Sequence, residues 1–394
     1  MFKRTKGEAL GQPDWILFFT TIAIAILGLM MVYSSTTDLS YRLWADASRL
    51  FKRQALWLLV GFVLMVIAMR VPYHHWTKFS ILLMAVTLVL LVISALLGQR
   101  LLIGQSVSPV ELAKLAVVVY IGHWLSSKSE VLTRLPYGLL PFTIMVGVIV
   151  GLVMSQKPAD LSEAMVIVIV AMVMFFMAGA DILQFAIGLA GGSAAFAFVV
   201  SKMPHALPRL ESYWAEMQDP LHSGSLQLVQ GLVALGSGGL LGVGAGNGRA
   251  KYQWLPAAHT DSIFAVIGEE LGLVGCLLLV GLFVLLAYRG LRTAALVQDT
   301  FGRLMALGVT TWITFQALVN MAVVTGTIPY TGITLPFISV GGSSLVACMV
   351  GIGIVLSISR TVNLEGATSH EARRVRGRDG GTRISRPDRR QSPA

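Results

Sequence analysis

One segment of the chain joins ionisable groups to an apolar helical pattern. Leu255–Gly272 reads LPAAHTDSIFAVIGEELG, with Asp261 where the apolar run begins. A glutamate pair, Glu269 and Glu270, follows about two helical turns further on. Carboxylates are costly inside a bilayer, so in a membrane chain they indicate a functional site. The chemistry open to them is proton transfer or the handling of a polar substrate at one face of the membrane.

The composition predicts that the elements carrying these groups are membrane spans. The chain is 55% hydrophobic and 13% charged, with a mean hydropathy of +0.74. Apolar runs long enough to cross the hydrocarbon core recur along it, which predicts an all-α polytopic integral membrane protein with about ten transmembrane helices. The predicted spans are Trp15–Tyr33, Ala55–Met69, Phe79–Leu97, Val110–Leu125, Leu139–Met154, Ala164–Gly179, Ile182–Val200, Ser262–Ala287, Leu304–Val324 and Ser343–Ser357.

An even number of spans predicts that both ends lie on the same side. We expect a cytoplasmic N-terminal tail at 1–14, a transmembrane domain at 15–359 and a large external loop at 201–260, between the seventh and eighth helices. Basic residues in short connections favour the cytoplasm. Those on the side shared with the chain ends are Lys3, Arg4, Lys6, Arg70, Lys78, Lys128, Arg134, Arg289, Arg292 and Arg303.

The connection between the first two spans is an exception to this charge pattern. It is external in this topology, yet it carries Arg42, Arg49, Lys52 and Arg53. The apolar residues between them are spaced as one helical face, which predicts a helix lying in the membrane interface. That face would consist of Leu43, Trp44, Ala47, Leu50 and Phe51.

Much of the net charge of +10 lies near the C-terminus. Residues 360–394 are rich in arginine, glycine, serine and proline. This composition predicts a disordered basic cytoplasmic tail held near anionic membrane lipid rather than bound to nucleic acid. The two cysteines, Cys276 and Cys348, fall in predicted spans, where packing is the expected role.

Several acids that we expect near the outer face also fit a purely structural role. Ser108–Glu111 and Asp160–Glu163 have the spacing of helix capping boxes, and Asp261 stands where a capping acid would. Lys114 lies about one turn from Glu111, inside a span. This pair is either a buried ion pair or part of the wall of a polar cavity.

Two glycine-rich segments are candidates for contact with a ligand. Gly236–Gly248 is either a tight backbone hairpin or a loop whose bare N–H groups approach a bulky polar ligand. Ser339–Ser344 opens the last span, where helix N–H groups suit a phosphate. The histidines and cysteines lack the spacing of a metal site, so we expect neither metal ligands nor a cofactor. A need for divalent cations stays undetermined.

In combination these segments resemble the SEDS family (shape, elongation, division and sporulation) over Asp14–Ser359. The matching pieces are Pro109–Lys114, Asp219-Pro220, Ala234–Gly246, Leu255–Asp261, Ile267–Gly275, Leu335–Ser339 and Gly341–Ser344. The resemblance implies a peptidoglycan glycosyltransferase that polymerises lipid II on the outer face of the bacterial cytoplasmic membrane. It also implies a class B penicillin-binding transpeptidase and other divisome membrane proteins as partners. Ile267–Gly272 and Gly332–Phe337 are more similar to the FtsW division branch than to the RodA elongation branch, which implies action at the septum.

The resemblance also implies roles for individual residues. Asp261 of the His-Thr-Asp motif becomes the catalytic residue, and Glu269 and Glu270 are structural or regulatory. The residues expected to bind substrate are Arg53, Arg100, Glu111, Lys114, His259, Ser343 and Ser344. The chain departs from the family motifs at Gln99–Leu102, Pro158–Ser162, Gly224–Gln227, Ser262 and Val340.

The reaction that the resemblance implies is an inverting glycosyl transfer. A sugar 4-hydroxyl attacks the anomeric carbon of a lipid-pyrophosphate sugar, and Asp261 accepts the hydroxyl proton. Lys114, Arg53 and Arg100 offset the charge of the leaving undecaprenyl pyrophosphate, while Glu111 holds Lys114. The alternatives are a lipid II flippase or transporter and a non-catalytic scaffold for the transpeptidase.

Overall fold

The computed structural model describes residues 11–97, 108–128, 132–156, 161–202, 225–252 and 254–379. Within these ranges the secondary structure is helical, without a strand. The helices are α1 Trp15–Trp44, α2 Arg49–Arg70, α3 His75–Leu97, α4 Pro109–Ser127, α5 Leu139–Met154, α6 Leu161–Met177, α7 Ile182–Lys202, α9 Leu226–Ser237, α10 Ile263–Leu296, α11 Thr300–Val324 and α12 Gly342–Asp379.

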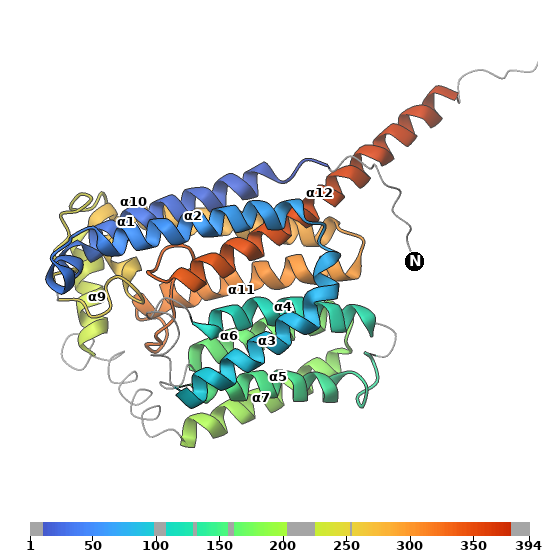
Figure 1. The fold of residues 1–394 in the computed structure, drawn as a ribbon, viewed down its shortest axis with the longest axis horizontal. Helices are drawn as coiled ribbons and strands as arrows, with labels where there is room; N and C mark the ends of the chain where they lie inside the picture. Colours follow the sequence, from blue (N-terminus) through green and yellow to red (C-terminus); the bar gives the residue numbers. More distant parts are fainter. Residues whose placement is uncertain are drawn as a thin grey trace, which may run out of the picture.

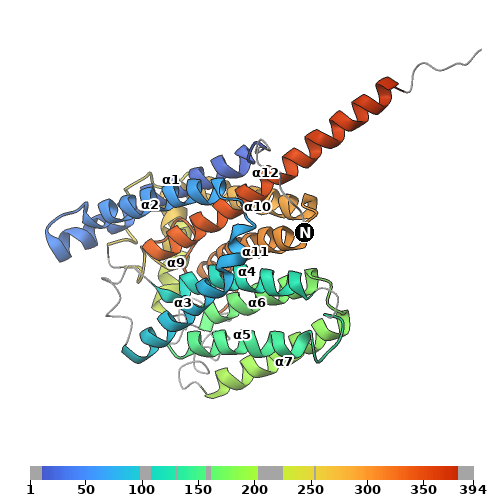
Figure 2. The same cartoon turned by 45° about the vertical axis from the view of Figure 1, so that its right-hand side comes forward.

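Each of the ten predicted spans falls on one helix, so the prediction of a helical multi-pass membrane protein is confirmed. The helices α1, α2, α3, α7, α10, α11 and α12 contain segments long and apolar enough to cross a membrane. In Figures 1 and 2, α1, α2, α10, α11 and α12 form one half of the bundle, and α4, α5, α6 and α7 form the other. The helix α9 lies within the predicted external loop.

Two helices form the centre of the bundle. The apolar windows of α11 and α12 are 67% and 72% buried within the protein, whereas that of α7 is 6% buried. The apolar surface of α7 is therefore left for lipid or another protein. A small residue lets α12 approach its neighbour α2 closely. A Cβ on Gly353 of α12 would lie 2.5 Å from the carbonyl oxygen of Met65 on α2.

The connection between α1 and α2 corrects the prediction of an interfacial helix. Helix α1 continues to Trp44, and α2 begins at Arg49 after a short turn. Leu43 and Trp44 therefore belong to a different helix from Leu50 and Phe51. The turn forms because Ala45 adopts the left-handed conformation, with φ 55°, and the Asp46 carboxylate accepts the N–H of Ser48. Hydrogen bonds from Ser48 and Lys52 lower the pKa of Asp46 to about 2.

The C-terminal segment differs from the prediction of disorder after Arg360. Helix α12 continues to Asp379 and projects beyond the bundle in Figure 1. The stretch Glu371–Arg376 contains alanine, glutamate and arginine, which favour a helix, and this offsets the disorder suggested by the overall composition. The remainder of the predicted tail, 380–394, lies outside the described residues.

Candidate active site

Asp261 lies in a turn directly before α10. The turn closes through hydrogen bonds from the N–H groups of Thr260 and Ser262 to the carbonyl oxygen of Ala257, which has φ 51°. The N-cap of α10 is Ser262, so Asp261 stands one residue outside the helix. Its side chain is half-buried, and a Cβ on Gly332 would lie 3.2 Å from its Oδ2. The carboxylate therefore lies against the connection between α11 and α12.

That connection holds the backbone around Asp261 at several points. The N–H of Val340 donates to the carbonyl of His259 at 3.0 Å, and the Ser339 hydroxyl donates to the carbonyl of Thr260 at 2.7 Å. Asn320 of α11 donates its amide to the carbonyl of Asp261 at 2.8 Å. Burial lowers the pKa of His259, which favours its neutral form. The turn is thus fixed on a rigid support.

The side chain of α2 that reaches this connection is Gln54, the neighbour of the predicted residue Arg53. Its amide nitrogen lies 3.4 Å from the carbonyl oxygen of Ser339, and its Oε1 lies 3.4 Å from the N–H nitrogen of Gly341. Arg53 is exposed on α2. Gln54 directly follows Arg53 in the sequence, but a neutral amide is a weaker signal for binding a pyrophosphate than an arginine is. Arg100, the other predicted arginine, lies outside the described residues.

The two predicted serines lie at the start of α12. The Ser343 hydroxyl oxygen accepts the N–H of Ser108 at 2.9 Å, and Ser344 is buried. This contact brings the start of α4 to the start of α12. It also explains why the predicted capping box of Ser108 and Glu111 does not form. Ser108 makes no side-chain cap hydrogen bond, and Glu111 pairs with Lys114 instead.

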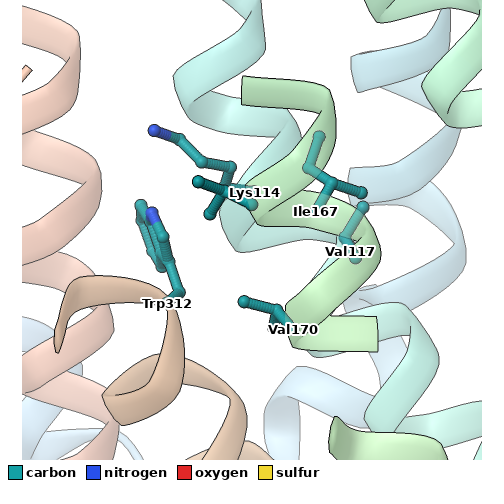
Figure 3. Close-up of a pocket in the computed structure, with 6 residues that line it drawn as sticks. Lys114, Val117, Ile167, Val170 and Trp312 are labelled. Atoms are coloured by element: carbon teal, nitrogen blue, oxygen red, sulfur yellow. The ribbon is translucent and has the colours of Figure 1, made fainter. Parts of the chain in front are cut away.

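Lys114 is the centre of a buried charged cluster. Its Nζ lies 2.8 Å from Glu111 Oε2 and 2.8 Å from Glu163 Oε2, and it donates to Gln316 Oε1 at 2.8 Å. Its side chain is 1% exposed. Figure 3 shows it facing the ring of Trp312, 5.5 Å from the centroid, above a gap too small for a water molecule.

These contacts favour a buried ion pair over a cavity wall. An ammonium group has three donors, and three acceptors surround this one. With these acceptors around it and a side chain 1% exposed, Lys114 is enclosed within the protein. Sequence reasoning missed Glu163 and Gln316 as members of this cluster. The spacing of Asp160 and Glu163 predicts a capping box rather than an ion pair, and the signal for Gln316 is a glutamine inside a predicted span.

The glycine-rich segment packs against a break in α10. Gly272 interrupts that helix with φ 67° and ψ −167°. The N–H groups of Val243 and Gly244 donate to the carbonyls of Glu269 and Glu270, at 3.0 and 3.1 Å. The N–H of Leu273 in turn donates to the carbonyl of Gly239 at 3.0 Å. The segment thus supplies backbone partners that the broken helix lacks.

The side chains of the glutamate pair bind the same segment. Glu270 accepts hydrogen bonds from the N–H of Gly246 at 2.9 Å, Lys251 Nζ at 2.8 Å and the Ser34 hydroxyl at 2.6 Å. Glu269 accepts the N–H of Arg249 at 2.7 Å. The N–H groups of Val243, Gly244 and Gly246 are therefore engaged within the protein. This arrangement favours the hairpin alternative, and it fits the structural role predicted for the glutamates.

Within the described ranges, no three or more histidine, cysteine, aspartate or glutamate side chains are grouped so that they could hold a metal ion. The polar groups described at the site are carboxylates, amides, hydroxyls, the His259 imidazole, the exposed Arg53 and the buried Lys114.

Comparison with known proteins decides the family. The model of a family described as cell cycle protein, which covers FtsW, RodA and SpoVE, matches residues 14–364. The chain belongs to this family. A relative named probable peptidoglycan glycosyltransferase FtsW, from Trichlorobacter lovleyi, is 35% identical and aligns over 93% of this chain and 98% of its own length. Stage V sporulation protein E of Bacillus subtilis is 38% identical over 89% of this chain and 97% of its own.

Solved structures agree with this placement in the FtsW, RodA and SpoVE family. One belongs to a study of the structural coordination of polymerization and crosslinking by a peptidoglycan synthase complex. It matches with a TM-score of 0.70 and 27% identity, over 89% of this chain and 98% of that one. The resemblance and the membrane fold predicted from the sequence are confirmed. The names of the FtsW relatives also support the predicted enzyme class.

Proposed function

We propose that this family member is a lipid II polymerase, a peptidoglycan glycosyltransferase that forms β-1,4 glycan strands at the outer face of the cytoplasmic membrane. The observation that carries the proposal is the position of Asp261. Its half-buried carboxylate lies at the start of α10, on a turn held by α11 and by the start of α12. A general base needs such a fixed yet accessible place.

The reaction balances with Asp261 as the base. The 4-hydroxyl oxygen of the acceptor sugar bonds to the anomeric carbon of the donor sugar, while the bond from that carbon to the pyrophosphate oxygen breaks. The hydroxyl proton passes to Asp261, and undecaprenyl pyrophosphate leaves with the bonding electrons. Attack from the opposite face inverts the α linkage to β. Base catalysis of this kind contributes about 10²–10⁴-fold in rate.

The charge of the leaving pyrophosphate needs compensation. We assign this role to Arg53, which is exposed on α2 beside Gln54, and to Arg100. The start of α12 with Ser343 and Ser344, near Gln54 and the Asp261 turn, is a further candidate for phosphate contact. His259 lies two residues before Asp261, where it could contact a sugar. We assign Lys114 and Glu111 a supporting role in the structure of the site, because the lysine is buried between two carboxylates and the Gln316 amide.

We further propose that both chain ends are cytoplasmic, with tails at 1–14 and 360–394. Contacts between the start of α1 and α12 support a shared side, since Asp14 N–H donates to Ser359 Oγ at 3.0 Å and Arg360 Nε to the carbonyl of Gly11 at 3.0 Å. The names of the FtsW relatives favour a role in septal wall synthesis. A class B penicillin-binding transpeptidase and divisome membrane proteins are the proposed partners, and the synthase complex among the similar structures supports this pairing.

Purified protein tested with lipid II separates the proposed function from its rivals. Polymer formed in detergent, and more of it with a cognate class B transpeptidase, would support the polymerase. Transbilayer movement of lipid II in vesicles without polymer would instead identify a flippase. If the chain neither polymerises nor moves lipid II but still binds the transpeptidase, it is a scaffold.

A further inference from the structure

Two amide side chains on one face of α11 lie beside the Asp261 turn. Gln316 and Asn320 are four residues apart, so they project from the same side of the helix. Both are buried, at 0% and 1% exposure. A buried amide inside a membrane helix needs partners, and each of these finds them in the connection that follows α11.

Asn320 links two backbone segments at the site, the turn that contains Asp261 and the connection between α11 and α12. Its Nδ2 donates to the carbonyl of Asp261 at 2.8 Å and to the carbonyl of Ile333 at 2.7 Å. Ile333 follows Gly332, the residue against which the Asp261 carboxylate lies. One amide group therefore fixes the distance between the backbone of Asp261 and the surface that its carboxylate contacts.

The orientation of this amide is determined by its acceptors. Both are carbonyl oxygens, which only the NH₂ end of an asparagine can satisfy. Its Oδ1 is buried and finds no hydrogen-bond partner among the described residues. Asn320 thus serves as a double donor, and an oxygen in place of Nδ2 would face two carbonyl oxygens.

Gln316 supports the same connection one residue further on. Its Nε2 donates to the carbonyl of Thr334 at 3.1 Å, while its Oε1 accepts from Lys114 at 2.8 Å and from Trp312 at 2.9 Å. The cluster of Glu111, Lys114 and Glu163 is therefore linked through Gln316 to the connection that contacts Asp261.

We propose that Asn320 is a positioning residue for Asp261, and that Gln316 extends this support to the buried Lys114 cluster. The inference rests on the proposed role of Asp261 as general base. Asn320 itself touches neither sugar nor pyrophosphate in this account. It acts by holding the carboxylate in reach of the acceptor hydroxyl, where a displacement of about 1 Å can cost about 10²-fold in rate.

The experiment uses full-length protein with its transpeptidase partner and measures kcat and KM for lipid II. Asn320→Asp keeps the shape but replaces the double donor, Asn320→Leu removes it, and Asn320→Ser retains one hydroxyl. We expect kcat to fall about 10–100-fold for the first two and less for serine, with KM changed less than about threefold. Gln316→Met should lower kcat by a smaller factor.

A matched control lies near the start of α7, against the connection between α4 and α5. Gln184 is 2% exposed, and its Nε2 donates to the carbonyl of Thr133 in the connection between α4 and α5. Gln184→Met removes a part-buried hydrogen bond of the same kind, from a buried amide to a backbone carbonyl, and should leave kcat within about twofold. If it lowers kcat as much as the Asn320 variants do, the effect is general and the inference is overturned.

A double-mutant cycle with Asp261→Asn separates positioning from stability. Without the base there is nothing to position, so Asn320→Asp should cost less than about twofold in residual rate in that background. Equal costs in both backgrounds would overturn the inference, as would wild-type kcat in the Asn320 variants while Asp261→Asn is inactive. An active Asp261→Asn protein would instead refute the base assignment. If none of the three Asn320 variants folds, the residue is structural and the inference fails.

Discussion

The carboxylate of Asp261 lies against the backbone of Gly332, and a Cβ at that glycine would come within 3.2 Å of Oδ2. The two residues are 71 positions apart in the chain, yet the site depends on their contact. Position 332 therefore controls where the proposed base sits, without donating or accepting a proton itself.

Replacing Gly332 with alanine should displace the carboxylate by a few tenths of an ångström. We expect Gly332→Ala to lower kcat for lipid II polymerisation about 3–10-fold, with a small change in melting temperature. Gly151→Ala in α5 is the control, because a Cβ there has no heavy atom within 4 Å. If Gly332→Ala has wild-type kcat, the contact does not position the base.

Removing the charge of Lys114 tests whether the lysine is structural. Lys114→Met leaves Glu111 and Glu163 buried without their cation, which should destabilise the protein by about 3–5 kcal/mol. Unfolding in mixed detergent measures this loss. A variant with wild-type stability and a large fall in kcat would contradict the structural assignment and support a role of Lys114 in substrate binding.

The segment Gly236–Gly248 should depend on Glu270. Glu270→Gln removes the charged partner of Lys251, whose side chain is 5% exposed, and should lower the free energy of unfolding by about 1.5–3 kcal/mol. Lys52→Gln breaks the exposed pair with Asp46, where water screens the charges, and should lower the free energy of unfolding by much less than Glu270→Gln does. If the two variants lose the same free energy of unfolding, the buried pair of Glu270 and Lys251 contributes no more to stability than an exposed pair does.

His259 predicts a pH dependence of stability with a definite sign. Because burial lowers its pKa below 6.5, the unfolded chain binds a proton that the folded chain does not. The contribution of the neutral His259 to the free energy of unfolding is therefore fully present above about pH 6.5. It is lost as the pH decreases from 6.5 to the lowered pKa of the folded state. Between pH 7.5 and 5.5 the melting temperature should fall more for the wild type than for His259→Gln. Parallel curves would argue against the burial of this imidazole.

The spans and the position of Asp261 just before a helix could be predicted from the sequence, because apolar runs and an acid at a span boundary are local signals. The partners of the site could not. Lys114 meets Gln316 across 202 positions and Asn320 meets Asp261 across 59, and a polar residue in a span does not reveal its partner. Local patterns also failed where tertiary contacts competed. The predicted capping box does not form, because the Ser108 N–H donates to Ser343 and Glu111 pairs with Lys114.

The central claim is that Asp261 is the general base, and Asp261→Asn tests it most directly. The substitution keeps the size of the side chain and much of its hydrogen-bonding capacity, but it removes the proton acceptor. The initial rate of lipid II polymerisation by the purified complex should fall about 10²–10⁴-fold, with normal expression and transpeptidase binding. A rate near that of the wild type would contradict the account and require another base.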